Sequence, residues 1–187
     1  MNTSTLRRSG AGFLGIGLPG AGLLVALALI LSTSLAAPLW ASGDEEAGRI
    51  TNLPVPRYVS MKAAEGNVRR GPSLTHRIDW VFKRRDMPLR ITGEHGHWRR
   101  VEDRDGMGGW VHYSLLSGSR TVIVEKDMLT LHARADPNAP VVAALELGVI
   151  ARVSECGAEW CLLRSGGFRG WAPKARLWGV LPREIFD

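Results

Sequence analysis

The stretch Met87-Pro88-Leu89-Arg90-Ile91-Thr92 alternates apolar residues with Pro, Arg and Thr. A period of two predicts a strand with one buried face. The residues Val149, Ala151 and Val153 repeat this pattern further along the chain, and turns rich in Gly separate the neighbouring segments, as at 70–73, 93–96 and 104–106. No stretch after the N-terminal region keeps a helical period over ten residues. The sequence therefore predicts an all-β fold.

The same stretch belongs to a repeat. Residues 57–118 can be laid over 120–179 so that the matched pairs include Val59 with Val122, Trp98 with Trp160, Trp110 with Trp171, and Leu116 with Leu177. Small deletions between the copies fall where turns are expected, because loops tolerate changes of length. We therefore expect a linker over 44–56, a first domain over 57–118 and a second domain over 119–187, each repeat unit being about 60 residues long.

The segment before the repeat carries an export pattern. The basic pair Arg7 and Arg8 precedes an uncharged stretch that is densest in apolar residues at 21–31, and the first acidic residue is Asp44. A basic start, an apolar middle and small residues near 41–43 are typical of a secretory signal. The stretch is also long enough to be an uncleaved anchor. Residues 1–43 are thus predicted to be a signal peptide or an N-terminal anchor, and the remainder to be periplasmic or extracellular.

Three groups of residues resemble the bacterial SH3 domain. They are 67–73 (NVRRGPS), 98–101 (WRRV) and 109–112 (GWVH), and the runs LLSG at 115–118, GVI at 148–150, GW at 170–171 and LWGV at 177–180 extend the likeness over almost all of 53–187. The second copy departs from the pattern where ARAD at 133–136 replaces the RGPS turn. The resemblance implies two tandem small SH3-like barrels, each five-stranded and partly open, in an exported protein.

The resemblance also implies a function class. Relatives of this domain accompany cell-wall hydrolases and hold them on peptidoglycan or peptide, and no hydrolase motif is recognisable in this sequence. We therefore expect a non-catalytic binding or scaffolding module, without a cofactor, whose partner is peptidoglycan or an extended segment of an envelope protein. Contact with the membrane is expected only through the N-terminal segment.

The two cysteines, Cys156 and Cys161, flank a tight turn between two expected strands. Such positions bring Cα atoms within disulfide range, and an oxidising compartment preserves the bond. We therefore predict a structural disulfide rather than a redox site. The matching residues of the first copy are Glu94 and Arg99, for which we expect an exposed ion pair in the same place.

Four residues of the first copy are candidate ligand contacts: Trp98, Tyr113, Arg70 and Arg100. The period of two turns Arg99 and Val101 inward and Trp98 and Arg100 outward, where an indole is a stacking surface for a sugar or a peptide. Packing is an equally good interpretation for Trp98.

Packing is also the better interpretation of the remaining tryptophans that we consider. Trp160 and its neighbour Leu162 are expected on the outer face, with Trp160 covering a barrel edge or the boundary between the copies. Trp110 and Trp171 are expected to pack in the last long strand, and Trp80 is expected to join Phe82 in the core.

Charge and histidine content separate the copies. Residues 57–118 contain twelve Lys or Arg and seven acidic residues, whereas 120–187 contain nine and eight, within a total formal charge of +6. A basic surface favours acidic partners, but export and the absence of nuclease or polymerase motifs disfavour nucleic acid. His95, His97 and His112 leave open a metal-dependent enzyme, and the cysteine pair a thiol-dependent one, as the alternative class. We expect neither a metal nor catalysis.

Overall fold

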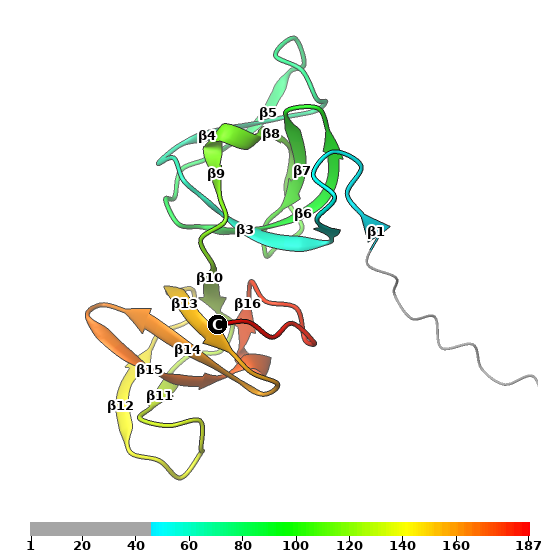
Figure 1. Cartoon of the computed structure of the whole chain (residues 1–187). Coiled ribbons are helices and arrows are strands. Elements are labelled where there is room, and N and C mark those ends of the chain that lie inside the picture. Colours follow the sequence, from blue (N-terminus) through cyan, green and yellow to red (C-terminus); the bar gives the residue numbers. More distant parts are fainter. Residues whose placement is uncertain (1–45) are drawn as a thin grey trace, which may run out of the picture. The chain divides into compact units, whose positions relative to one another are not determined.

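The computed structural model describes residues 46–187, which form two small barrels of β-structure (Figure 1). The predicted export segment, residues 1–43, lies outside this range. No helix within residues 46–187 has the length and apolar character needed to cross a bilayer. The all-β, tandem SH3-like prediction is confirmed.

The first barrel is a sheet in the order β5-β4-β8-β7-β6-β3-β9. Its elements are β3 (Arg57–Met61), β4 (Gly66–Arg69), β5 (Ile78–Phe82), β6 (Pro88–His95), β7 (Trp98–Glu102), β8 (Gly108–His112), the 3-10 helix η1 (Tyr113–Leu115) and β9 (Leu116–Ser117). Side chains from the inner face fill the barrel, because alternate residues of a strand point to one side of the sheet. They are Met61, Val68, Phe82, Leu89, Ile91, Val101 and Val111.

The second barrel repeats this arrangement in the order β12-β11-β15-β14-β13-β10-β16. Its elements are β10 (Thr121–Val124), β11 (Leu129–His132), β12 (Val141–Leu145), β13 (Ile150–Cys156), β14 (Trp160–Ser165), β15 (Phe168–Pro173), the 3-10 helix η2 (Lys174–Arg176) and β16 (Leu177–Trp178). Each sheet thus has seven strands, the last of which (β9 or β16) has only two residues, where the resemblance implied five. The identical order shows that the sequence repeat is a structural repeat.

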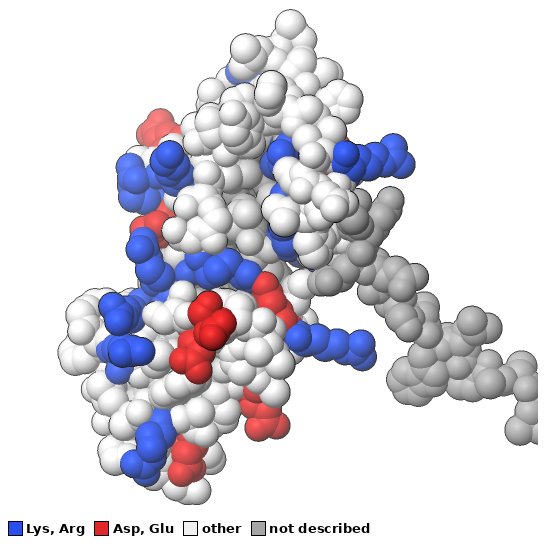
Figure 2. Space-filling model, viewed as in Figure 1, with Lys and Arg blue, Asp and Glu red and all other residues white. Residues whose placement is uncertain are grey.

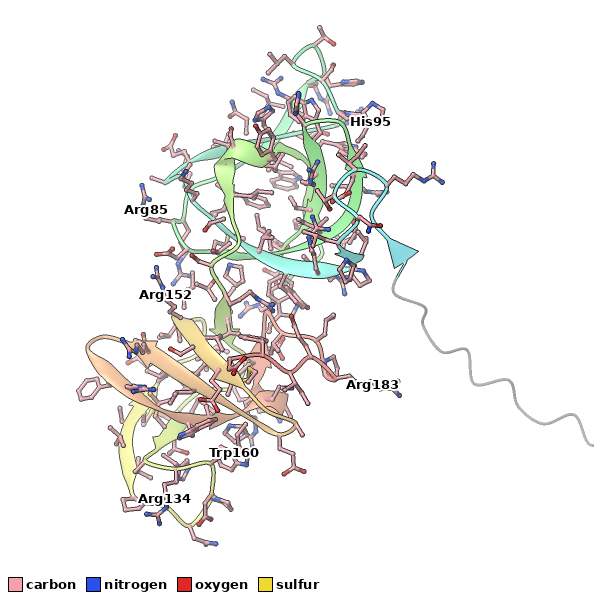
Figure 3. All side chains as sticks on the ribbon, viewed as in Figure 1. Arg85, His95, Arg134, Arg152, Trp160 and Arg183 are labelled. Carbon is pink, nitrogen blue, oxygen red and sulfur yellow. A yellow bond between two sulfur atoms is a disulfide. The ribbon has the colours of Figure 1, made fainter. Side chains whose placement is uncertain are left out.

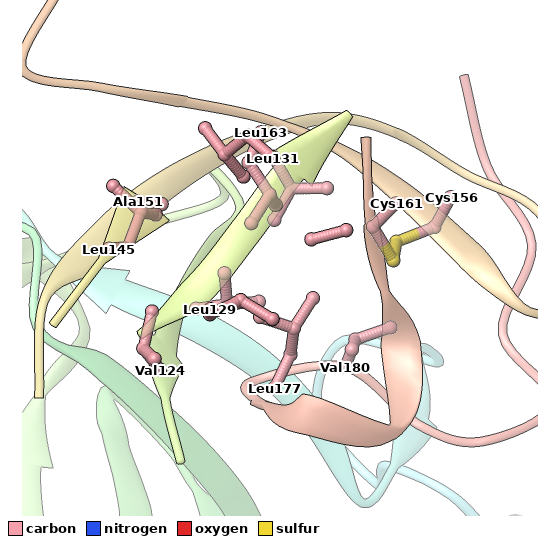
Figure 4. Packing of buried hydrophobic residues seen from close by; sticks show 13 residues of the cluster. Val124, Leu129, Leu131, Leu145, Ala151, Cys156, Cys161, Leu163, Leu177 and Val180 are labelled. Carbon is pink, nitrogen blue, oxygen red and sulfur yellow. A yellow bond between two sulfur atoms is a disulfide. The ribbon is translucent and has the colours of Figure 1, made fainter. Parts of the chain in front are cut away.

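The core of the second barrel includes both cysteines (Figure 4). Cys156 and Cys161 pair across the β13–β14 hairpin with Cα atoms 4.1 Å apart and sulfur atoms at disulfide distance. They pack in one cluster with Leu131, Leu163 and Val180. The predicted disulfide across the end of this hairpin is therefore confirmed.

The segment before the first barrel also contains strands. Two short strands, β1 (Glu46–Ala47) and β2 (Pro54–Val55), pair with each other within the residues expected to be a linker. The turn between them is bound to Glu94 of β6, through Ile50 and Thr51. The segment therefore forms part of the first barrel's surface.

Trp80 differs from its expected position. Phe82 is buried in the core, but Trp80 is 44% exposed. The reason is that β5 is the edge strand of its sheet: among residues 46–187 it pairs only with β4, so its other edge is open. The tip of the β4–β5 hairpin, which contains the exposed Leu74, is largely uncharged on the face that Figure 2 shows.

Candidate functional site

The outer surface of β7 and β8 carries the residues that point away from the core. Arg99 and Val101 are buried, as predicted, and the alternate residues Trp98 and Arg100 face outward. Strand pairing sets Trp98 opposite His112 and Arg100 opposite Trp110. Two indoles, an imidazole and a guanidinium thus share one face of the sheet.

Ring contacts join this face to the start of η1. Trp98 meets His112 edge to face, with ring centroids 5.5 Å apart, and His112 lies 4.9 Å from the ring of Tyr113. His97 lies 5.5 Å from Tyr113. His112 Nδ1 shares a hydrogen bond of 2.8 Å with Ser114 Oγ, which fixes the imidazole between the two aromatic rings. Tyr113 is 49% exposed, so the cluster is open to solvent.

We call this surface the aromatic face; it consists of His97, Trp98, Arg100, Trp110, His112 and Tyr113. The structure therefore joins Trp98 and Tyr113 through His112 and places Arg100 on the same face. Arg100 is exposed and makes no ion pair with any residue from 46 to 187, so its guanidinium is available to a ligand.

Arg70 is placed differently from the other three candidates. It lies at the base of the β4–β5 turn, where its guanidinium contacts Asp79 at 3.1 Å. Arg77 contacts the same carboxylate at 2.8 Å. Hydrogen bonds from Arg77 and Arg70 lower the pKa of Asp79. Arg70 is thus engaged by Asp79 in the β4–β5 hairpin and takes no part in the ring contacts that join Trp98, His112 and Tyr113.

Two features of the aromatic face were missed in the sequence analysis. Trp110 was expected to pack, but it is half-buried on the outer surface beside Arg100. His97 and His112 were considered as candidate metal ligands, with no metal expected, and not as members of an aromatic cluster; both contact Tyr113. The period of two in β8 places residues 110 and 112 on the same face, and this signal could have identified Trp110 and His112 as neighbours.

The three histidines do not converge. His95 lies near Trp110, with ring centroids 6.4 Å apart, whereas His97 and His112 are neighbours at 6.0 Å. Within the described part of the chain, no group of three His, Cys, Asp or Glu side chains is arranged to hold a metal ion.

Glu94 fixes the hairpin that presents the aromatic face. It lies opposite Arg99 in the β6–β7 hairpin, and Arg99 Nε is 3.5 Å from its Oε1. The expected exposed pair is in fact buried, with the Glu94 side chain 1% exposed and that of Arg99 9% exposed. Arg57 Nη2 also donates to Oε1 at 2.7 Å. The reason for the burial is the β1–β2 turn, which lies against Glu94.

Burial by itself would raise the pKa of Glu94. The hydroxyl of Thr51, the guanidinium of Arg57, and the backbone N–H groups of Thr51 and Ile50 all donate to the carboxylate and lower its pKa to about 2. The carboxylate is therefore ionised at neutral pH and holds the β1–β2 turn, β3 and β6 together at this end of the barrel.

The second barrel presents a different surface at the matching place. Trp160 lies opposite Pro173, where the first barrel pairs Trp98 with His112. Trp160 also meets the buried His132 edge to face at 5.7 Å. Leu162, expected to face outward with Trp160, is instead buried, with 5% of it exposed, although it lies outside the main core cluster. The exposed cation of the first barrel thus has no counterpart here.

The match to a known protein family falls once on each copy of the repeat. The model of the bacterial SH3 domain matches residues 62–118 and again 125–179. No curated protein matches the sequence. Among solved structures, NlpC1 and NlpC2 from Trichomonas vaginalis are each 9% identical, with TM-scores of 0.32 and 0.31. The matches cover 70% and 66% of this chain and 48% of each of those chains, so this chain spans about half their length.

Bacterial SH3 domains are generally cell-wall-binding modules that commonly bind peptidoglycan and often occur in exported proteins. Both family matches fall on sheets with the same strand order, and together they cover more than half of the sequence. The chain therefore belongs to the bacterial SH3 domain family.

Proposed function

We propose that this protein is an exported, non-catalytic binding module of the cell envelope, located in the periplasm or outside the cell. Its ligand is peptidoglycan or an extended segment of an envelope protein, and its first barrel makes the principal contacts. The observation that carries the proposal is the chain of ring contacts from Trp98 through His112 to Tyr113, on an open surface that also bears the exposed Arg100.

Each part of the aromatic face suits such a ligand. Indole and phenol rings stack on the apolar face of a sugar or on the flat backbone of an extended peptide. A guanidinium beside them donates hydrogen bonds to carboxylate or carbonyl oxygens. No part of this recognition needs a reactive group. Arg70 is a peripheral contact in the proposal, because Asp79 already binds its guanidinium.

Retention on purified peptidoglycan tests the proposal. We expect the full chain to sediment with peptidoglycan and the Trp98→Ala variant to bind about tenfold more weakly, a change of about 1.4 kcal/mol. Trp80→Ala is the matched control, since Trp80 is an exposed indole of the same barrel on the edge strand β5. The proposal of peptidoglycan binding fails if the full chain is not retained, or if both variants are retained like the unaltered protein.

A further inference from the structure

The second barrel contains a cavity of about 650 Å³ beside Trp160. Its walls are mainly apolar. They consist of Ala158, Trp160, Pro173, Lys174, Ala175, Leu177, Val180 and Pro182, together with Glu159, which is exposed to solvent. Figure 3 labels Trp160, which begins β14 at the end of the β13–β14 hairpin. A volume between about 300 and 1,000 Å³ is typical of sites for small organic ligands.

The cavity occupies the position of the aromatic face in the repeat, but it is built differently. In the second barrel Trp160, Pro173 and Lys174 stand where the first barrel has Trp98, His112 and Tyr113. Val180 and Pro182, from the segment after β16, add a further wall. An open aromatic surface in one copy is thus replaced by an apolar cavity in the other.

The segment that forms this wall is firmly held. Glu184 binds the guanidinium of Arg120 through both carboxylate oxygens, and it accepts a hydrogen bond of 3.0 Å from the Leu181 N–H. Phe186 and Cys156 exchange two backbone hydrogen bonds, of 2.7 and 3.0 Å. The wall is therefore a fixed part of the barrel, and the cavity has a defined shape.

Lys174 is the unusual member of the lining because it is only 6% exposed. Its Nζ donates to the carbonyl oxygens of Glu184, at 2.6 Å, and of Pro182, at 3.4 Å. Both acceptors are uncharged. No carboxylate in residues 46–187 lies within ion-pair distance of this ammonium, and the carboxylate of Glu184 is held by Arg120.

A buried ammonium whose direct contacts are all neutral is costly, because it has lost water without gaining a paired counter-charge. The Glu184 carboxylate attracts it through space but is bound directly by Arg120. It can donate three hydrogen bonds, and two are used. An anionic ligand supplies both the counter-charge and the third acceptor. The apolar walls require that the rest of the ligand be apolar.

We propose that this cavity binds the carboxylate end of an apolar ligand, with the Lys174 ammonium as its charge partner and Trp160 and the two prolines as its walls. Two sources provide this chemistry: the C-terminal carboxylate of a peptide with aliphatic last residues, and a medium-chain alkanoate. The site lies in the second barrel and does not depend on the aromatic face.

Calorimetric titration of the full chain tests the site with three probes: the peptide acetyl-Ala-Val-Leu with a free carboxylate, the same peptide as a C-terminal amide, and octanoate. We expect the free acid of at least one ligand to bind, and the peptide acid, where it binds, to exceed its amide by about tenfold or more. Preference for the peptide or for octanoate identifies the source. Equal affinity for acid and amide, or no binding by either acid at millimolar concentration, overturns the proposal.

Variants locate the binding. Lys174→Met removes the charge and should abolish acid binding, whereas Lys174→Arg keeps the charge and should retain part of it. Acid binding that survives Lys174→Met unchanged contradicts the proposal. Because Lys174 also holds the segment after β16, thermal unfolding checks that the Met variant folds; if it does not, Trp160→Ala and the comparison of acid with amide on the unaltered chain decide. Trp98→Ala should leave these affinities unchanged, which separates this site from the aromatic face.

Discussion

Replacement of Glu94 by Gln tests the idea that one buried carboxylate holds the first barrel to the β1–β2 turn. The side chain is 1% exposed, and its Oε1 accepts hydrogen bonds from Thr51 Oγ1 at 2.6 Å and from Arg57 Nη2 at 2.7 Å. Its Oε2 accepts from two backbone N–H groups at 3.0 Å. Gln keeps the shape of the side chain but has one acceptor oxygen and no charge.

The magnitude follows from the pKa of Glu94, which the fold lowers from 4.5 to about 2. The unfolded chain therefore binds this proton more tightly than the folded chain, so the carboxylate stabilises the fold fully above about pH 4.5. This contribution is lost as the pH falls toward about 2. The gap between the two pKa values corresponds to a contribution of about 3 kcal/mol at neutral pH. We expect Glu94→Gln to lower the free energy of unfolding of the first barrel by about this amount at pH 7.

Urea unfolding followed by tryptophan fluorescence measures the effect at pH 7 and near pH 2.5. The difference between Glu94→Gln and the unaltered protein should shrink strongly at the acid pH. Glu102→Gln is the matched control, because the Arg90–Glu102 pair has the same 2.7 Å distance but side chains 42% and 28% exposed. Its loss should not exceed about 1 kcal/mol. Equal losses in the two variants, or a loss from Glu94→Gln that is the same at both pH values, would refute the reasoning.

Two further predictions concern packing. The disulfide should leave no titratable thiol in the unreduced protein, and the double change Cys156→Ser with Cys161→Ser should lower the free energy of unfolding of the second barrel by roughly 2 kcal/mol while leaving the first unchanged. Two free thiols would contradict the disulfide. A Cβ on Gly108 would lie 1.9 Å from the Val101 carbonyl oxygen. Gly108→Ala should therefore lower the free energy of unfolding of the first barrel, measured in urea, by about 3 kcal/mol. Gly118→Ala, where a Cβ meets nothing within 4 Å, is its control, and equal stability of the two would be inconsistent with this packing.

The period of two and the repeat predicted much of the structure. Alternation in β7 correctly placed Arg99 and Val101 inside and Trp98 outside, because successive side chains of a strand point to opposite faces of the sheet. Alignment of the copies also placed Cys156 and Cys161 opposite each other, at the hairpin position that Glu94 and Arg99 occupy in the first barrel. Local sequence patterns are therefore sufficient to predict contacts between two strands that follow each other directly in the chain.

Other features depended on contacts that strand patterns do not encode. The Glu94–Arg99 pair is buried because residues 50 and 51, more than forty positions away, bind the same carboxylate. Trp80 is exposed because β5 has a neighbour on only one side, which the apolar run of its sequence does not reveal. The cavity beside Trp160 is formed partly by Val180 and Pro182, which have no counterpart in the alignment of the two copies.

Each repeat begins with an arginine at the equivalent position, and the contacts of these two arginines determine how the protein can be divided into single-barrel fragments. Arg57 binds Glu94 and, through it, the turn that precedes the barrel, whereas Arg120 binds Glu184 in the segment that follows its barrel. The family match covers only 62–118 and 125–179, so fragments cut at those limits would discard both arginines and both flanking segments. A fragment of the first barrel should instead begin near residue 46, since otherwise the buried carboxylate of Glu94 would lose the groups that donate to it. A fragment of the second barrel should extend through residue 187, since otherwise the buried ammonium of Lys174 would lose its acceptor.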